Sequence, residues 1–223
     1  MDRRTFLKMA SAAGASVFLN TYHVDIAKAI EESDWNIVWL HGSECTGCSV
    51  SFLNGEHPDV LQAIKQLNVV IQYHETLMTQ QGLFVDGQTV ENAALNANYA
   101  LEEFLASGKP YILVVEGGIP LGPDGTGNYL KIAGKPFVED VRNAAKNALV
   151  TVAIGACATF GGMPGADPNP TDLVGVQFSG PKKGGALGAD YISKAGLPVV
   201  NIPGCPSHPD WVLLTLAAVI LDK

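Results

Sequence analysis

The residues with the strongest chemical potential in this sequence are its four cysteines, Cys45, Cys48, Cys157 and Cys205. The first two form a CxxC pair, and the other two stand singly far downstream. Four thiolates that meet at one point suit an iron–sulfur cluster or a structural zinc ion. A CxxC pair alone also suits a redox-active dithiol. The chemistry therefore depends on whether the fold brings all four together.

Short apolar runs predict the elements that must position these cysteines. Buried strands are expected over residues 36–40, 69–71, 111–115, 148–154 and 198–202, and helices over 60–67, 91–106, 136–147 and from Pro209 onward. Strands that alternate with helices predict an α/β domain whose parallel sheet is covered by helices on both faces. We expect one domain of flavodoxin-like type over residues 30–223.

Each cysteine follows the end of a predicted strand. Cys45 and Cys48 come after the first strand, Cys157 after the fourth and Cys205 after the fifth. The carboxyl ends of parallel strands share one edge of the sheet, which is where open α/β folds bind ligands. The sequence therefore predicts that the four cysteines meet at this edge.

The residues beside the cysteines favour an iron–sulfur cluster and leave two alternatives open. Gly47, Gly155, Gly204 and Pro206 flank the cysteines, and such residues allow the backbone to approach sulfur closely. A compact zinc site usually has two close cysteine pairs, whereas only one pair is close here. A structural zinc protein and a thiol–disulfide oxidoreductase that uses the CxxC pair are the alternative functions.

Composition and charge exclude several classes of protein. The chain has 223 residues, of which 47% are hydrophobic and 16% charged, so it holds enough apolar material for a folded core. The formal net charge is -8 and no basic stripe offsets it, so we expect no nucleic-acid partner. No apolar stretch reaches the roughly 18 residues of a membrane-spanning helix. Any association with a membrane would therefore go through a partner protein.

The N-terminus is similar to an export signal. Residues 2–8 read DRRTFLK, which resembles a twin-arginine motif, and residues 27–29 read AKA, which resembles a small-residue cleavage site. We therefore expect residues 1–29 to be a twin-arginine signal peptide. The mature protein would then be periplasmic or lie at the outer face of the cytoplasmic membrane. The alternative is an ordinary N-terminus with two chance arginines.

Four segments in order resemble the small subunit of nickel–iron hydrogenases. They read ECTGCS (44–49), VEGGIP (115–120), GACATFGG (155–162) and NIPGCP (201–206), and the likeness extends from about Trp35 to the end of the chain. The resemblance implies that Cys45, Cys48, Cys157 and Cys205 hold a proximal [4Fe–4S] cluster. It also implies a heterodimer with a large subunit that carries the nickel–iron centre.

The implied activity is electron transfer within an oxidoreductase. The large subunit would oxidise dihydrogen or reduce protons, and the small subunit would relay the electrons. Typical small subunits continue into a C-terminal region with a medial and a distal cluster, whereas this sequence has no cysteine beyond the four. We therefore expect either a minimal one-cluster form or a missing C-terminal region. A one-cluster form needs an additional redox partner close to the cluster.

Glu44, directly before the first cysteine, is the remaining candidate site residue. It would pass protons or form hydrogen bonds near the subunit interface, and a capping carboxylate at a helix start is the equal alternative. Glu116 ends a predicted strand, so we expect it to have a structural hydrogen-bonding role. His41 and His74 show no ligand spacing. The cluster subunit of respiratory complex I, a homologous type, usually has adjacent cysteines, so the CxxC pair favours a hydrogenase.

Overall fold

The computed structural model describes residues 35–56, 58–80, 82, 84–86 and 88–221. The expected signal peptide over residues 1–29 lies outside these residues, so it stays a prediction. None of the helices in the described ranges is both long enough and apolar enough to cross a lipid bilayer.

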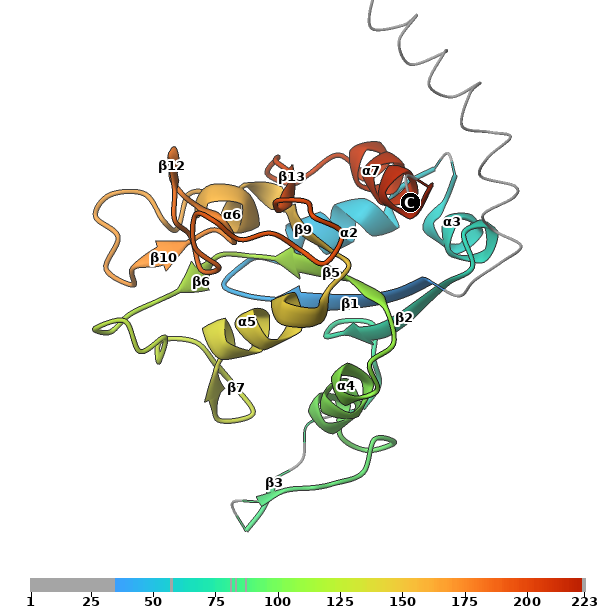
Figure 1. The fold of residues 1–223 in the computed structure, drawn as a ribbon, viewed down its shortest axis with the longest axis horizontal. Coiled ribbons are helices and arrows are strands. Elements are labelled where there is room, and N and C mark those ends of the chain that lie inside the picture. Colours follow the sequence, from blue (N-terminus) through green and yellow to red (C-terminus); the bar gives the residue numbers. More distant parts are fainter. Residues whose placement is uncertain (1–34, 57, 81, 83, 87, 222–223) are drawn as a thin grey trace, which may run out of the picture.

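The predicted strands form a single five-stranded parallel sheet (Figure 1). The strands are β1 (Trp35–His41), β2 (Val69–His74), β5 (Tyr111–Glu116), β9 (Val150–Ile154) and β13 (Val200–Ile202). Their spatial order is β13-β9-β5-β1-β2. This is the flavodoxin-like order, in which the sheet grows first to one side of β1 and then to the other. The predicted fold class is confirmed, and the carboxyl ends of the strands share one edge.

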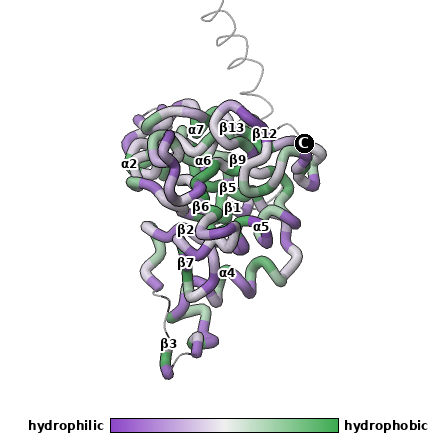
Figure 2. The backbone as a smooth tube through the Cα atoms, turned by 90° about the vertical axis from the view of Figure 1, so that its left-hand side faces the viewer, coloured by the Kyte–Doolittle hydropathy of each residue, from purple (hydrophilic) through white to green (hydrophobic). Residues whose placement is uncertain are grey.

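Helices cover both faces of the sheet (Figure 1). One face carries α4 (Ala97–Ala106) and α5 (Phe137–Asn147), and the other carries α2 (Gly47–Leu53), α3 (Val60–Gln66) and α7 (Pro209–Leu221). Successive side chains of a strand point to opposite faces. Val38 therefore packs in the core shared with α4 and α5, whereas Ile37 and Trp39 pack in the core shared with α2, α3 and α7. Figure 2 shows hydrophobic residues concentrated along the inner strands β5 and β9.

The remaining elements are short. They are α6 (Gly155–Phe160) and the strands β3 (Phe84–Val85), β4 (Gln88–Thr89), β6 (Ile119–Pro120), β7 (Lys131–Ile132), β8 (Lys135–Pro136), β10 (Leu173–Val174), β11 (Phe178–Ser179) and β12 (Lys182–Lys183). The small strands pair as antiparallel two-stranded units outside the main sheet. Both views show the β3 segment extending away from the main body (Figures 1 and 2).

One boundary and two short helices differ from the sequence-based expectation for physical reasons. The helix predicted over 91–106 begins only at Ala97, because the buried Asn96 side chain accepts hydrogen bonds from the amides of Asn98 and Tyr99 and caps the helix there. The helices α2 and α6, each of which follows a strand end, were not predicted. Their buried residues are Ser49 and Phe52 in α2 and Gly155, Ala158 and Thr159 in α6, so neither helix has a repeating apolar face in the sequence.

Candidate metal centre at the carboxyl edge of the sheet

The four cysteines meet at the carboxyl edge, as the strand assignments predicted. Cys45 and Cys48 follow β1, Cys157 lies in α6 directly after β9, and Cys205 lies between β13 and α7. All four line one pocket, and all four are free thiols. Cys45 and Cys205 are exposed, whereas Cys48 and Cys157 are half-buried. The pocket is therefore open on one side and reaches into the fold on the other.

Glycines bring the backbone against the sulfur atoms. A Cβ on Gly155 would lie 2.6 Å from Cys48 Sγ, and a Cβ on Gly47 would lie 3.0 Å from Cys45 Sγ. Gly155 also has a φ of 86°, which side-chain-bearing residues rarely adopt. A side chain at either position would displace a sulfur atom. The glycines thus leave space for the sulfur atoms, which share the pocket lining with Glu44, Glu116, Ile154 and Pro206.

The spacing of the sulfur atoms distinguishes between two kinds of metal site. Ligand sulfurs about 2.3 Å from one tetrahedral zinc ion stand about 3.8 Å from each other. Among the described residues, the one group of three metal-binding side chains within 4.8 Å of one another is His41, Glu44 and Glu116, and it contains no cysteine. These four cysteines therefore do not form the close sulfur cage of a bound zinc ion in the structure.

The electrostatics of the thiols argue against a reactive dithiol. Burial raises the pKa of Cys48 to about 11, although hydrogen bonding from the Ser207 backbone opposes this, and the negative charge of Glu116 raises it further. Burial also raises the pKa of Cys157, and the charges of Cys205 and Cys45 add to that rise. A catalytic dithiol needs a lowered thiol pKa. A bound metal group supplies the positive charge that stabilises thiolates at such positions.

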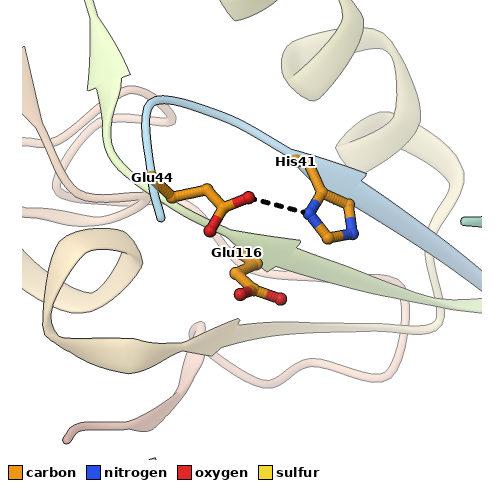
Figure 3. A group of neighbouring side chains, drawn as sticks. All are labelled: His41, Glu44 and Glu116. Atoms are coloured by element: carbon orange, nitrogen blue, oxygen red, sulfur yellow. Dashed lines mark hydrogen bonds and ion pairs between the residues drawn. The ribbon is translucent and has the colours of Figure 1, made fainter. Parts of the chain in front are cut away.

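Glu44 lines the pocket and lies between β1 and α2. Figure 3 shows its carboxylate pointing toward His41. His41 Nδ1 lies 3.1 Å from Glu44 Oε1. The backbone amide and the hydroxyl of Thr46 both donate to the Glu44 carboxylate. Burial raises the pKa of Glu44, the hydrogen bond from His41 opposes that rise, and the charge of Glu116 adds to it. Glu44 thus bonds to the residue before α2, whereas the first amides of that helix bond to Glu116, so Glu44 is not its helix cap.

A buried polar cluster next to the pocket was missed from the sequence. The rings of His41 and His74 lie 4.7 Å apart between their centroids, and Trp39 packs against both. His74 Nδ1 lies 3.0 Å from Thr76 Oγ1, and burial lowers the pKa of His74 to about 4. The signal in the sequence was the spacing of Trp39 and His41, which are two residues apart on a buried strand and share a face.

Glu116 has the structural role expected from the sequence. It is buried at the end of β5 and accepts hydrogen bonds from Trp39 and from the start of α2. Among His41, Glu44 and Glu116, only His41 and Glu44 bond to each other (Figure 3). The oxygens of both carboxylates already accept hydrogen bonds from protein donors, which argues against a cation site.

Comparison with known proteins identifies the family. The family model described as NADH ubiquinone oxidoreductase, 20 Kd subunit, matches residues 45–219. The F420 non-reducing hydrogenase I small subunit of Methanosarcina mazei is 53% identical over 228 residues, and the match covers 100% of this chain and 58% of the relative. The periplasmic [NiFeSe] hydrogenase small subunit of Desulfomicrobium baculatum is 33% identical, with 98% of this chain and 66% of the relative covered. The chain belongs to the nickel–iron hydrogenase small-subunit family.

A solved hydrogenase structure agrees with this assignment. The [NiFeSe] hydrogenase from Desulfovibrio vulgaris Hildenborough superposes with a TM-score of 0.67 at 29% identity, covering 86% of this chain and 61% of that chain. Relative to the Methanosarcina mazei subunit, this small-subunit chain spans 58% of the length. The five-stranded parallel sheet with its covering helices agrees with this structural likeness.

Proposed function

We propose that this chain is the electron-transfer subunit of a nickel–iron hydrogenase and that Cys45, Cys48, Cys157 and Cys205 hold a single [4Fe–4S] cluster. The observation that carries the proposal is the set of four free thiols around one pocket at the carboxyl edge of the sheet. When bound, such a cluster supplies one-electron transfer. The chain's own contribution is to fix the four thiolates and to keep side chains out of the space between them.

The exposed apolar residues support docking of a large partner subunit at the cysteine edge. Apolar side chains are exposed on the elements that carry or follow the cysteines, and we call these residues the apolar rim: Val50, Leu53, Phe160, Met163, Trp211 and Leu214. Exposed apolar groups of this kind are typical of protein interfaces. We expect the partner to be a hydrogenase large subunit with the nickel–iron centre, in an interface above about 2,000 Å².

An additional redox partner close to the cluster is also proposed, because a subunit with one cluster needs an electron acceptor or donor near it. A membrane link would run through such a partner. Glu44, beside Cys45 and in contact with His41, is proposed to lie at or near the large-subunit interface and to take part in a proton path.

We also propose export by the twin-arginine route to the periplasm or the outer face of the cytoplasmic membrane. Support comes from the DRRTFLK segment and from the likeness to the periplasmic [NiFeSe] hydrogenase small subunit of Desulfomicrobium baculatum. Changing both Arg3 and Arg4 to Lys should leave the chain in the cytoplasm in cell fractionation. Normal export of that variant would reject the signal assignment.

The decisive experiment combines metal analysis with an activity assay on anaerobically purified protein. We expect about four iron and four sulfide per chain, loss of both in Cys157→Ala, and hydrogen-dependent dye reduction only when the large subunit co-purifies. Zinc with negligible iron would favour the structural zinc protein. A metal-free protein with a reversible Cys45–Cys48 disulfide would favour the thiol–disulfide oxidoreductase.

A further inference from the structure

Glu116 occupies the middle of the cysteine edge. It ends β5, the central strand, where it pairs with His41 of β1 on one side and with Ile154 of β9 on the other. The segments after β1 and β9 carry three of the four cysteines, whereas β5 ends in this carboxylate. Figure 3 shows Glu116 on β5 beside Glu44 and His41. A negatively charged side chain thus lies between the segments that supply the thiols.

Both carboxylate oxygens of Glu116 are satisfied by donors. Oε1 accepts from the backbone amides of Cys48 at 3.1 Å and Ser49 at 3.0 Å. Oε2 accepts from the Ser49 hydroxyl at 2.6 Å and from Trp39 Nε1 at 3.2 Å. The residue is 1% exposed. Amide and indole nitrogens only donate, so the geometry fits an acceptor-only carboxylate.

The bonds to Cys48 and Ser49 complete the N-terminus of α2. The first amides of a helix have no partner within the helix. Thr46, the residue at the N-cap position, makes no side-chain capping bond. Glu116 supplies the missing acceptor from 68 residues away in the sequence. Because one of the two amides belongs to Cys48 itself, the carboxylate fixes the backbone from which that thiol projects.

The groups that stabilise the charge of Glu116 are uncharged hydrogen-bond donors: two backbone amides, a hydroxyl and an indole N–H. Within the described part of the chain, no lysine or arginine forms an ion pair with it. Burial keeps solvent screening weak, so a negative charge there acts strongly on its surroundings. An electron added to a neighbouring cluster adds negative charge, and a fixed negative charge opposes that step. Local charge and hydrogen bonding are recognised controls of cluster reduction potentials.

We propose that Glu116 is a positioning residue for Cys48 and that its buried charge lowers the reduction potential of the cluster. The inference rests on the proposed function, since it requires the cluster. It gives the central strand β5, which has no cysteine at its end, a part in holding the cluster ligand Cys48. Trp39, held between the rings of Phe52 and His74 at centroid distances of 5.4 and 4.9 Å, and Ser49 keep the carboxylate in place.

The test compares two near-isosteric variants of the complex with its large subunit. Glu116→Gln keeps an acceptor for the amides of Cys48 and Ser49 but removes the charge, so the midpoint potential in an EPR-monitored titration should shift to a more positive value. Ser49→Ala removes a donor and leaves the charge less compensated, so the potential should shift to a more negative value. Glu103→Gln, the same chemical change at an exposed position on α4, is the matched control and should leave the potential unchanged.

A third variant tests the positioning role separately. Glu116→Asp keeps the charge but is one methylene too short for the amides, so backbone hydrogen exchange over residues 47–53 should accelerate and iron should be lost faster under chelation. That readout does not depend on activity, and it applies even if Glu116→Gln folds poorly.

The possible outcomes separate the two proposals. Wild-type protein without iron overturns the proposed function and, with it, this inference. Wild-type protein with iron, but with shifts of the same sign in Glu116→Gln and Ser49→Ala or with no shift at all, overturns the charge effect alone. Unchanged hydrogen exchange and iron retention in Glu116→Asp overturn the positioning role.

Discussion

Glycines control how closely the backbone approaches the thiols. At Gly155 two constraints coincide: a positive φ and a neighbouring sulfur that would lie 2.6 Å from an added Cβ. Gly125 has only the first constraint, because its φ is 74° and nothing lies within 4 Å of an added Cβ. Substitutions at Gly155 and Gly125 therefore distinguish the effect of backbone strain from the effect of crowding at the metal centre.

Gly155→Ala should lose iron, whereas Gly125→Ala should keep it. Both variants should lose about 1 kcal/mol of stability from the unfavourable φ. Only the first places a methyl group where Cys48 Sγ lies, so only the first should disturb the thiol arrangement. Iron per chain and thermal unfolding of both variants measure the two effects. Equal iron content in the two variants would contradict the crowding argument.

At the scale of elements, the first amides of a helix are capped either by a neighbouring residue or by one distant in the sequence. α4 begins where Asn96, its own N-cap, accepts two amide hydrogen bonds. α2 lacks such a local cap and is completed by Glu116 from another strand. α5 begins with Glu139 and Asp140 in its first turn, where negative charge is favourable. Asp140, however, is also partly buried, which works against its charge.

Asp140 makes the stability of the fold depend on pH. Burial raises its pKa to about 6, although Lys135 opposes the shift, and an unfolded aspartate has a pKa of about 3.9. The folded state therefore binds the proton more tightly, so stability falls as the pH rises from about 4 to about 6. Asp140→Asn should not show this loss of stability. Its free energy of unfolding should therefore rise relative to that of wild type by about 1 kcal/mol between pH 4 and pH 7, once solvent screening is allowed for.

Thermal unfolding of wild type and Asp140→Asn across this pH range measures the difference. Glu103→Gln changes an exposed carboxylate on α4 that is not among the charges shifting the pKa of Asp140, and it is the control. A difference between Asp140→Asn and wild type that stays constant with pH would contradict the assignment.

At the scale of the whole molecule, the cysteine edge combines an open thiol pocket with exposed apolar side chains. The described residues form an α/β body whose two cores lie on opposite faces of the sheet. The apolar rim lies outside both cores, on elements next to the cysteines. Apolar side chains such as Leu61 and Ile192 are exposed elsewhere as well, so the rim supports an interface only together with the open thiol pocket beside it.

Val50→Lys should weaken binding of the large subunit and leave the fold intact. Val50 is 54% exposed on α2, so the isolated chain should tolerate a lysine there. A charge buried in the core of an interface costs about 2 kcal/mol or more of binding free energy, which is roughly a 30-fold loss of affinity. Leu95→Lys, at a site with 50% exposure before α4, is the control. Co-purification yield and the dissociation constant measure the effect; equal losses in the two variants would contradict an interface at the rim.

The sequence by itself determined the sheet and the meeting of the cysteines. Continuously apolar runs mark buried strands, and a parallel sheet aligns their carboxyl ends, so the positions of Cys45, Cys157 and Cys205 after strand ends were sufficient. These inferences depend on local patterns and on one general property of parallel sheets, and neither requires knowledge of side-chain packing.

Only the tertiary structure decided which residues line the thiol pocket and which groups Glu116 contacts. The bond from Cys48 to Glu116 joins positions 68 residues apart, and the pairing of His41 with His74 joins neighbouring strands. Such contacts depend on strand register, on the start of α2 and on how Trp39 packs, and none of these has a periodic signature in the sequence. Hydrogen bonds and sulfur spacings are set within tenths of an ångström by packing between distant segments, whereas hydrophobic patterns specify only which segments are buried.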